Sequence, residues 1–148
     1  RSLMRPLALL FLALALAGSA AAQATRFSAD APVINFRLPM FTPEGHRAWL
    51  VRGSEARFAA ANVIDIKELT MTLFTGDATD RVETMILSPV ARVLADQSVV
   101  TGPDRIRVIN DNFEATGLQW RYEHKEKSIS IAKNVRVTFR AELKDFLK

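Results

Sequence analysis

Hydrophobic and polar residues alternate along much of the chain from position 48 onward. The pattern is clearest in residues 117–139, where alternation occurs three times between short polar turns. Leu118, Trp120 and Tyr122 fall on one side of an extended chain there, with polar residues between them. A period of two places successive side chains on opposite faces of a sheet. We therefore predict strands with one apolar face and one face in water.

Eleven short strands are predicted between residues 48 and 139, separated by residues typical of turns. The expected strands are 48–52, 55–60, 63–66, 69–75, 81–87, 90–95, 98–101, 105–110, 114–123, 128–132 and 134–139. The expected turns are Gly53-Ser54, Gly76-Asp77, Ser88-Pro89, Gly102-Pro103-Asp104 and Asn110-Asp111-Asn112. Short strands at a spacing of roughly ten residues favour an all-β sandwich, barrel or jelly roll over βαβ units.

Residues 1–22 have the parts of a secretory signal peptide. Arg5 provides a positive charge, residues 7–17 are apolar, and Ala20-Ala21-Ala22 and Ala22-Gln23-Ala24 offer cleavage sites. An apolar run of roughly ten residues is too short to cross a bilayer as a helix. We expect cleavage before Gln23 and export to the periplasm. The alternative is a retained inner-membrane anchor.

The rest of the chain divides into three parts. Residues 23–47 contain Pro32, Pro39 and Pro43 and are predicted to be irregular. Residues 48–140 are predicted to form the β-domain. Residues 141–148 are expected to be a tail or a short helix, and the pattern does not separate these two.

The charge balance argues against a nucleic-acid partner. The chain has 20 Lys and Arg against 16 Asp and Glu, and without Arg1 and Arg5 the balance is 18 to 16. These charges are interspersed, whereas nucleic-acid binding uses a basic patch or stripe. There is no cysteine, so an exported protein of this size must rely on its sheet and core without disulfides.

Residues suited to catalysis or metal binding are few. The only histidines, His46 and His124, have no ligand-like spacing, so we expect no metal site and no cofactor. The sequence has no G-x-S-x-G nucleophile motif and no glycine-rich phosphate loop. Asp77 and Asp80 are interpreted as a solvated turn. We therefore expect no enzyme, with a small hydrolase of unrecognised site as the weakest alternative.

The apolar face has two interpretations. It can be the closed core of a β-fold, or it can line a trough between two facing layers that admits acyl chains. Each methylene moved from water into such a trough gains about 0.8 kcal/mol. Periodicity does not distinguish the two, and a gap filled by side chains from end to end would exclude the second.

Four segments resemble a known family. They are W-L-V-R-G-S-E-A-R (49–57), L-T-M-T-L-F (69–74), S-P-V-A-R-V-L-A-D-Q-S-V-V-T-G (88–102) and G-L-Q-W-R-Y…I-S-I-A-K-N-V-R-V-T-F (117–139). Together they resemble the OstA-like periplasmic lipopolysaccharide-transport proteins, the LptC and LptA group. The resemblance covers about ninety residues and leaves open whether the chain has an A-type or a C-type role.

The resemblance implies a twisted, open β-jelly roll with an apolar groove for the acyl chains of lipid A. It implies no catalytic residue. It also implies partners, namely other OstA-like β-domains joined through edge strands, and an inner-membrane ABC transporter whose ATP hydrolysis drives movement. A homo-oligomer formed by the same edge pairing is a further expectation.

The leading hypothesis is thus a non-enzymatic periplasmic protein that binds lipopolysaccharide or a related lipid and hands it to a partner. The rival is a scaffolding β-domain with a closed core and only protein partners. The alternation assigns ten residues to the groove: Trp49, Met71, Leu73, Leu118, Trp120, Ile129, Ile131, Val135, Val137 and Phe139.

Overall fold

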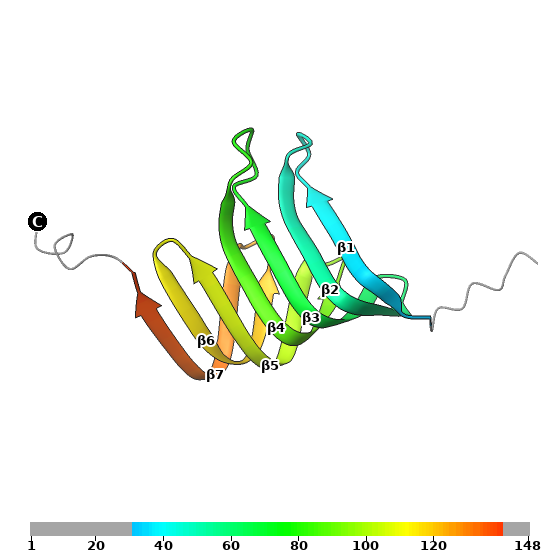
Figure 1. Cartoon of the computed structure of the whole chain (residues 1–148). Coiled ribbons are helices and arrows are strands. Elements are labelled where there is room, and N and C mark those ends of the chain that lie inside the picture. The colour runs from blue at the N-terminus through cyan, green and yellow to red at the C-terminus, as the bar shows by residue number, and fades with distance from the viewer. Residues whose placement is uncertain (1–30, 141–148) are drawn as a thin grey trace, which may run out of the picture.

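The computed structural model describes residues 31–140, which form one antiparallel sheet of seven strands. The strands lie side by side in chain order (Figure 1). They are β1 (Val33–Phe41), β2 (Arg47–Ala60), β3 (Val63–Phe74), β4 (Val82–Leu94), β5 (Val99–Asn110), β6 (Phe113–Glu123) and β7 (Ser128–Phe139). The all-β open jelly roll is therefore confirmed. The expected signal segment 1–22 and tail 141–148 lie outside the described residues.

The sheet is folded along a line that crosses the middle of the strands, so it forms a trough (Figure 1). Several residues beside this line have positive φ, namely Asn35 (54°), Glu68 (53°), Gln119 (59°) and Asn134 (53°). The strand register also shifts there, between Leu87 and Arg92 and between Gly102 and Arg105. Left-handed residues and bulges bend a strand without ending it. We call this line the bend.

The prediction of eleven separate strands was therefore wrong. Gly53-Ser54, Ser88-Pro89 and Gly102-Pro103-Asp104 lie within β2, β4 and β5 instead of reversing the chain. Proline cannot donate to the ladder and glycine weakens it, so these residues interrupt pairing for a step. The chain then continues in the same strand at a new angle. Only tertiary pairing distinguishes such a bend from a turn.

Strand β1 lies in the segment that we expected to be irregular. It pairs with β2 through eight residue pairs from Val33↔Ala56 to Phe41↔Arg47, and Pro39 lies opposite Leu50. Proline is tolerated there because β1 is an edge strand, whose outer side has no ladder to donate to. The folded part therefore begins before position 48.

The two faces of the sheet differ in chemistry. One row of the inner face crosses the sheet from β2 to β7 as Val51, Met71, Ile86, Val108, Ala115 and Val137. A second row, beyond the bend, is Phe58, Ile64, Val93, Val100, Tyr122 and Ile129. The outer face has ion pairs between neighbouring strands, such as Asp65–Arg92 at 2.7 Å. The predicted alternation of an apolar and a polar face is thus present.

Within residues 31–140, no helix is long and apolar enough to cross a bilayer.

Candidate functional site: the inner face of the trough

The central part of the trough is filled by its own side chains. Val51, Met71 and Ile86 are fully buried, and Val93 and Val100 across the bend are equally inaccessible. Buried and partly buried apolar side chains of both halves form one continuous cluster. From β2 to β6, the space between the halves is therefore a packed core.

Small residues at the bend allow this packing. Gly102 of β5 lies directly opposite Trp120 of β6, and a Cβ at Gly102 would overlap the indole ring. Gly117 of β6 is covered in the same way by Ile131 of β7. At these positions the large side chain of one strand lies over the backbone of the glycine in the neighbouring strand. Any side chain in place of the glycine would prevent this contact.

Ser88 connects the strands at the bend through hydrogen bonds. Trp120 Nε1 donates to Ser88 Oγ at 3.1 Å, and Ser88 Oγ lies 2.5 Å from the carbonyl oxygen of Arg105. Ser88 is the only buried polar residue in the part of the chain that the structure describes. Burying a hydroxyl or an indole N–H without a hydrogen-bond partner is costly, and these bonds avoid that cost. They also join β4, β5 and β6 at one place.

An aromatic cluster connects the two halves of the trough across its interior. Trp49 and Tyr122 contact edge to face with ring centroids 6.0 Å apart, and Trp49 stacks on His124 at 5.2 Å. Tyr122 Oη lies 2.8 Å from His124 Nδ1. Strands β2 and β6 are not neighbours in the sheet, so the contact between Trp49 and Tyr122 crosses the interior. We call Trp49, Tyr122 and His124 the aromatic clamp.

Burial perturbs both titratable members of the clamp. Desolvation, with a contribution from the negative charge of Glu83, raises the pKa of Tyr122 to about 12. Desolvation, and then the positive charge of Lys127, lowers the pKa of His124. Both shifts favour the neutral form, so the clamp is an uncharged cluster at neutral pH.

The inner face becomes accessible toward β7. Val137 is 44% exposed although its row is buried as far as Ala115, and Val135 and Phe139 are 53% and 70% exposed. A depression of about 290 Å³ beside the aromatic clamp is lined in part by Leu73, Phe113, Tyr122, His124 and Ile129. Apolar surface that is core in β2–β6 is therefore open to solvent at the β7 edge.

The ten predicted groove residues are distributed between these regions. Trp49, Met71, Leu73 and Trp120 lie in the packed core and are at most 9% exposed. Ile129 and Ile131 are half-buried beside them, and Val135, Val137 and Phe139 form the open part. The structure thus brings nine of the ten to one face.

Leu118 is the exception, and its predicted orientation was wrong. It lies opposite Arg105 and Lys133 and lines a depression that also contains Arg105, Arg107 and Thr116. The positive φ of Gln119 marks a bulge that shifts the alternation by one step between Gly117 and Trp120. A bulge of this kind is not visible in the hydrophobic pattern.

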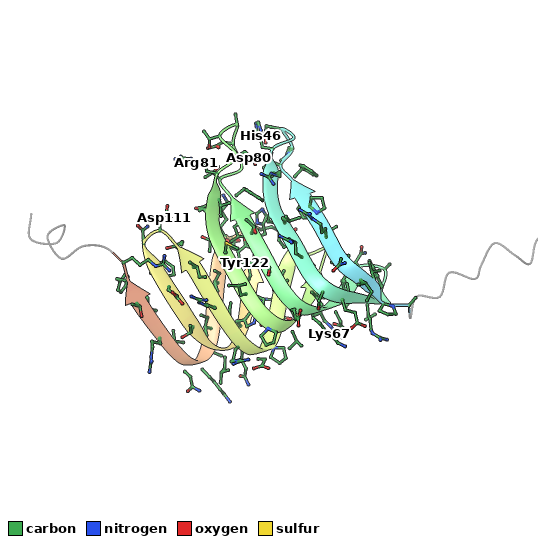
Figure 2. All side chains as sticks on the ribbon, in the orientation of Figure 1. His46, Lys67, Asp80, Arg81, Asp111 and Tyr122 are labelled. Carbon is green, nitrogen blue, oxygen red and sulfur yellow. The ribbon has the colours of Figure 1, made fainter. Side chains whose placement is uncertain are left out.

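Sequence reasoning also missed two features. The sequence pattern gave His124 no role, whereas it is half-buried against Trp49. Arg47 pairs with Asp80 at 2.7 Å and lies over the ring of Phe74, so it joins the β1–β2 and β3–β4 turns, which lie together in Figure 2. Neither contact has a signal in local spacing, because the partners are far apart in the chain.

The site has apolar surface but little reactive chemistry. Among residues 31–140, no three His, Asp or Glu side chains gather in a way that could hold a metal ion. The inner face can therefore hold an apolar ligand or a partner, and it contains no arrangement that we can assign to catalysis.

Comparison with known proteins agrees with this geometry. No curated protein matches the sequence. Among solved structures, the chain is similar to LptH of Pseudomonas aeruginosa, described as the LptA-homologous periplasmic component of the lipopolysaccharide transport device. The TM-score is 0.51 at 9% identity, over 76% of this chain and 94% of that one, which shows a shared fold.

The family model described as lipopolysaccharide-assembly, LptC-related, matches residues 20–140. This range includes all seven strands. The chain therefore belongs to the LptC-related family of lipopolysaccharide-assembly proteins, which are non-enzymatic components of lipopolysaccharide transport.

Proposed function

We propose that this protein binds the acyl chains of lipopolysaccharide, or of a related lipid, on its inner face in the periplasm. It then passes the lipid to a partner β-domain that continues the sheet at an edge strand. The observation that carries the proposal is the exposure of Val135, Val137 and Phe139, at 44–70%, on the face that is otherwise core. Leaving such surface in water is unfavourable, and an acyl chain or a partner sheet would cover it.

The packed centre determines where binding starts. Trp49, Met71 and Trp120 are inaccessible while the halves are closed, so a lipid first contacts Ile129, Ile131 and the exposed residues of β7. Deeper binding requires the two halves to separate at the aromatic clamp. The sequence-predicted groove is thus proposed to be an open part at β7 and a closed part that opens on loading.

The β7 edge is suited to pairing with a partner strand. Among the strands of residues 31–140, β7 has a neighbour on one side only, so alternate backbone groups on its other side have no ladder partner there. A partner sheet joined there would extend the inner face beyond Phe139. The proposed partners are other OstA-like β-domains, as part of a pathway driven by an inner-membrane ABC transporter.

Val137→Asp tests the lipid site directly. We expect uptake of a fluorescent acyl probe, and of lipopolysaccharide, to fall at least tenfold because a charge would lie on the apolar face. Thr138→Asp is the matched control, since Thr138 is the next residue, is exposed and lies on the outer face opposite Glu114. Equal uptake by both variants, with unchanged folding, would contradict the proposal.

The packed core gives some support to a second candidate, a scaffolding β-domain that binds only protein. That function predicts no lipid uptake by the unmodified protein under any condition and no lipid in the protein purified from the periplasm. Mass spectrometry of the exported protein measures both the mature N-terminus and any retained lipid.

A further inference from the structure

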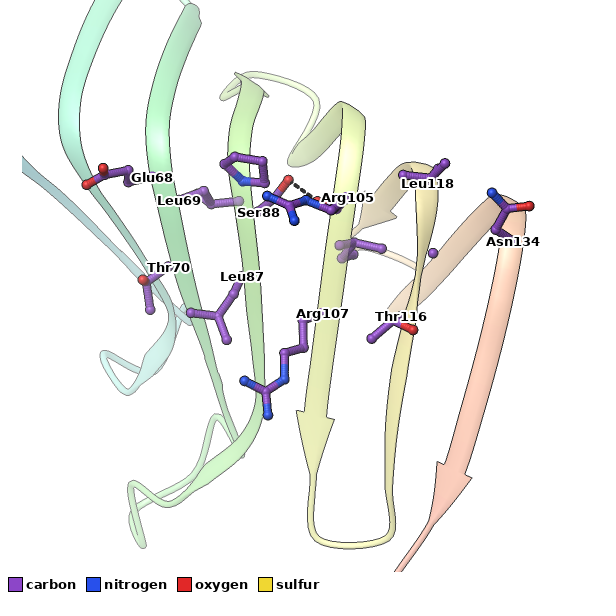
Figure 3. Close-up of a pocket in the computed structure, with 13 residues that line it drawn as sticks. Glu68, Leu69, Thr70, Leu87, Ser88, Arg105, Arg107, Thr116, Leu118 and Asn134 are labelled. Carbon is purple, nitrogen blue, oxygen red and sulfur yellow. Dashed lines mark hydrogen bonds between the residues drawn. The ribbon is translucent and has the colours of Figure 1, made fainter.

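One row of the outer face crosses the entire sheet and carries four arginines. Directly opposed residues follow one another from β1 to β7 as Arg37, Arg52, Thr70, Leu87, Arg107, Thr116 and Arg136. We call this row the arginine rung. Figure 3 shows its central members, Thr70, Leu87, Arg107 and Thr116, in line across four strands. The rung contains no acidic residue.

The charge of the rung is largely uncompensated. Arg37, Arg52 and Arg136 are exposed and form no ion pair with another residue of the described range. Arg37 lies directly opposite Arg52, and like charges in this arrangement repel each other. Arg107 alone has a carboxylate partner, Glu114, at 2.5 Å.

The outer face on the other side of the bend has the opposite character. Each of its arginines has an acid beside it, as in the pairs Arg57–Glu55, Arg92–Asp65 and Arg121–Glu123. The two halves of one outer face therefore differ in a way that overall composition does not show. Positive charge without a partner is concentrated along a line next to the bend.

The surface beside the rung is hollowed and partly apolar. Depressions of about 700 Å³ and 420 Å³ lie along it and share Glu68 and Thr70. The first of them is also lined by Leu87, Pro89 and Leu118. Val90, at the bend itself, is 38% exposed and lines a further depression, of about 590 Å³, on the other side of the bend. The bends of successive strands follow one another along one margin of the molecule (Figure 1), so this surface is a ridge.

We propose that this ridge binds an anionic phospholipid surface. Guanidinium groups bind phosphate oxygens in a bidentate manner, and Leu87, Pro89 and Val90 would contact the boundary between headgroups and acyl chains. Seven strands at about 4.8 Å spacing make the rung roughly 29 Å long. A straight ridge touches a flat surface along its whole length, whereas an acidic peptide strand would be expected to pair with an exposed edge.

This binding is separate from the proposed lipid site. The rung is on the outer face and the exposed apolar residues of β7 are on the inner face, so both can be occupied at once. The ridge would hold the trough in one orientation on a membrane surface. Either proposal can fail without the other.

Co-sedimentation of the full chain with vesicles tests the ridge. The vesicles contain phosphatidylcholine alone or with phosphatidylglycerol at about a third of the lipid. We expect Arg37→Gln/Arg52→Gln/Arg136→Gln to reduce binding to the anionic vesicles about a hundredfold at low ionic strength. The control Arg57→Gln/Arg92→Gln/Arg121→Gln removes the same charge from the same face and should change binding less than tenfold. Residues 1–22 are identical in both variants, so the difference reports the position of the charge.

Equal losses in the two variants, or no preference for anionic vesicles, would overturn the proposal. The proposal would also be overturned if Arg37→Gln/Arg52→Gln/Arg136→Gln kept its binding to vesicles but lost binding to poly-glutamate. The partner of the rung would then be an acidic polypeptide. A local readout is also available because the chain has no cysteine. An environment-sensitive fluorophore on Val90→Cys should shift to the blue with anionic vesicles, and the same label on Ser130→Cys, outside the ridge, should not. Identical responses at the two positions would also overturn the proposal.

Discussion

At the scale of single residues, the contacts at the bend connect three strands. Trp120 lies over Gly102, and its indole N–H bonds to Ser88, which also reaches the carbonyl of Arg105. Each of these residues is suited to its position for a different reason. The glycine leaves space, the tryptophan fills it, and the serine satisfies the polar atom that the tryptophan buries.

Ser88→Ala tests this interpretation. The buried indole N–H of Trp120 would lose its acceptor, so we expect the free energy of unfolding to fall by about 1–3 kcal/mol. Urea denaturation measures the change, and Ser130→Ala on the surface should stay within about 0.5 kcal/mol of the unmodified protein. In a double-mutant cycle with Trp120→Phe, the double variant should lose less than the sum of the single variants. Strict additivity would show that the two residues act independently.

His124 predicts a pH dependence of stability. Its pKa is lowered in the folded protein, mainly by burial, from the ordinary value of 6.5. Between the two values the unfolded chain binds more protons, so the free energy of unfolding rises with pH there. The stability is fully present above about pH 6.5 and is lost as pH falls below it. Chemical denaturation at pH 7.5 and 5.5 should show this fall, and His124→Gln should reduce it. An unchanged fall in the variant would assign it to another group.

At the scale of the elements, strand β7 differs from the strands between the edges. Its inner face is exposed from Val135 to Phe139, and within residues 31–140 one of its backbone edges has no neighbour. The amide of Arg140 donates to the carbonyl of Asn112 at 2.8 Å, which identifies that pair as hydrogen-bonded. Because hydrogen-bonded and non-hydrogen-bonded pairs alternate, the amide of Thr138 faces β6 and the amide of Val137 faces the free edge.

Proline at these two neighbouring positions should therefore have opposite effects. Val137→Pro removes a donor from the free edge, so we expect the fold to remain while association with a partner β-domain falls at least tenfold. Thr138→Pro removes a ladder bond and should lower the melting temperature. Light scattering and melting curves measure the two outcomes. Association that survives Val137→Pro would exclude pairing through β7.

At the scale of the whole molecule, the trough combines a closed centre with an open end. The aromatic clamp contacts both halves, and the buried apolar cluster is continuous from Phe36 to Tyr122. Interiors packed in this way do not deform gradually. A ligand that binds only at β7 therefore leaves the centre unchanged, and a ligand that enters the centre must separate the halves.

Brominated acyl chains distinguish these two states. Trp49 and Trp120 are the only tryptophans and both are buried, so a chain held at β7 should quench their emission by less than about a tenth. Phe139→Trp adds a reporter on the open part, and its emission should be strongly quenched. Thr138→Trp, on the outer face, is the control. Strong quenching in the unmodified protein would show that loading opens the trough along its length.

Much of this architecture could be predicted from the sequence because alternation is a local property. Spacing alone assigned Val135, Val137 and Phe139 to the correct face of the sheet. The same reasoning failed at Leu118 and β1. In the first case one bulge moved the side chain to the other face, and in the second an edge position made Pro39 acceptable in a strand. The bulge and the edge position both depend on which strands are neighbours in the sheet. The local pattern of residues does not contain this information.

From the sequence alone it follows that the chain folds as strands with one apolar and one wet face, because a period of two places successive side chains on opposite faces of a sheet. The tertiary structure decided where that apolar face is core and where it is open surface. That difference depends on whether another layer lies across from it, and within residues 31–140 none covers Val135, Val137 and Phe139. It also placed four arginines from four strands in one row, because the register between strands is set only when they pair.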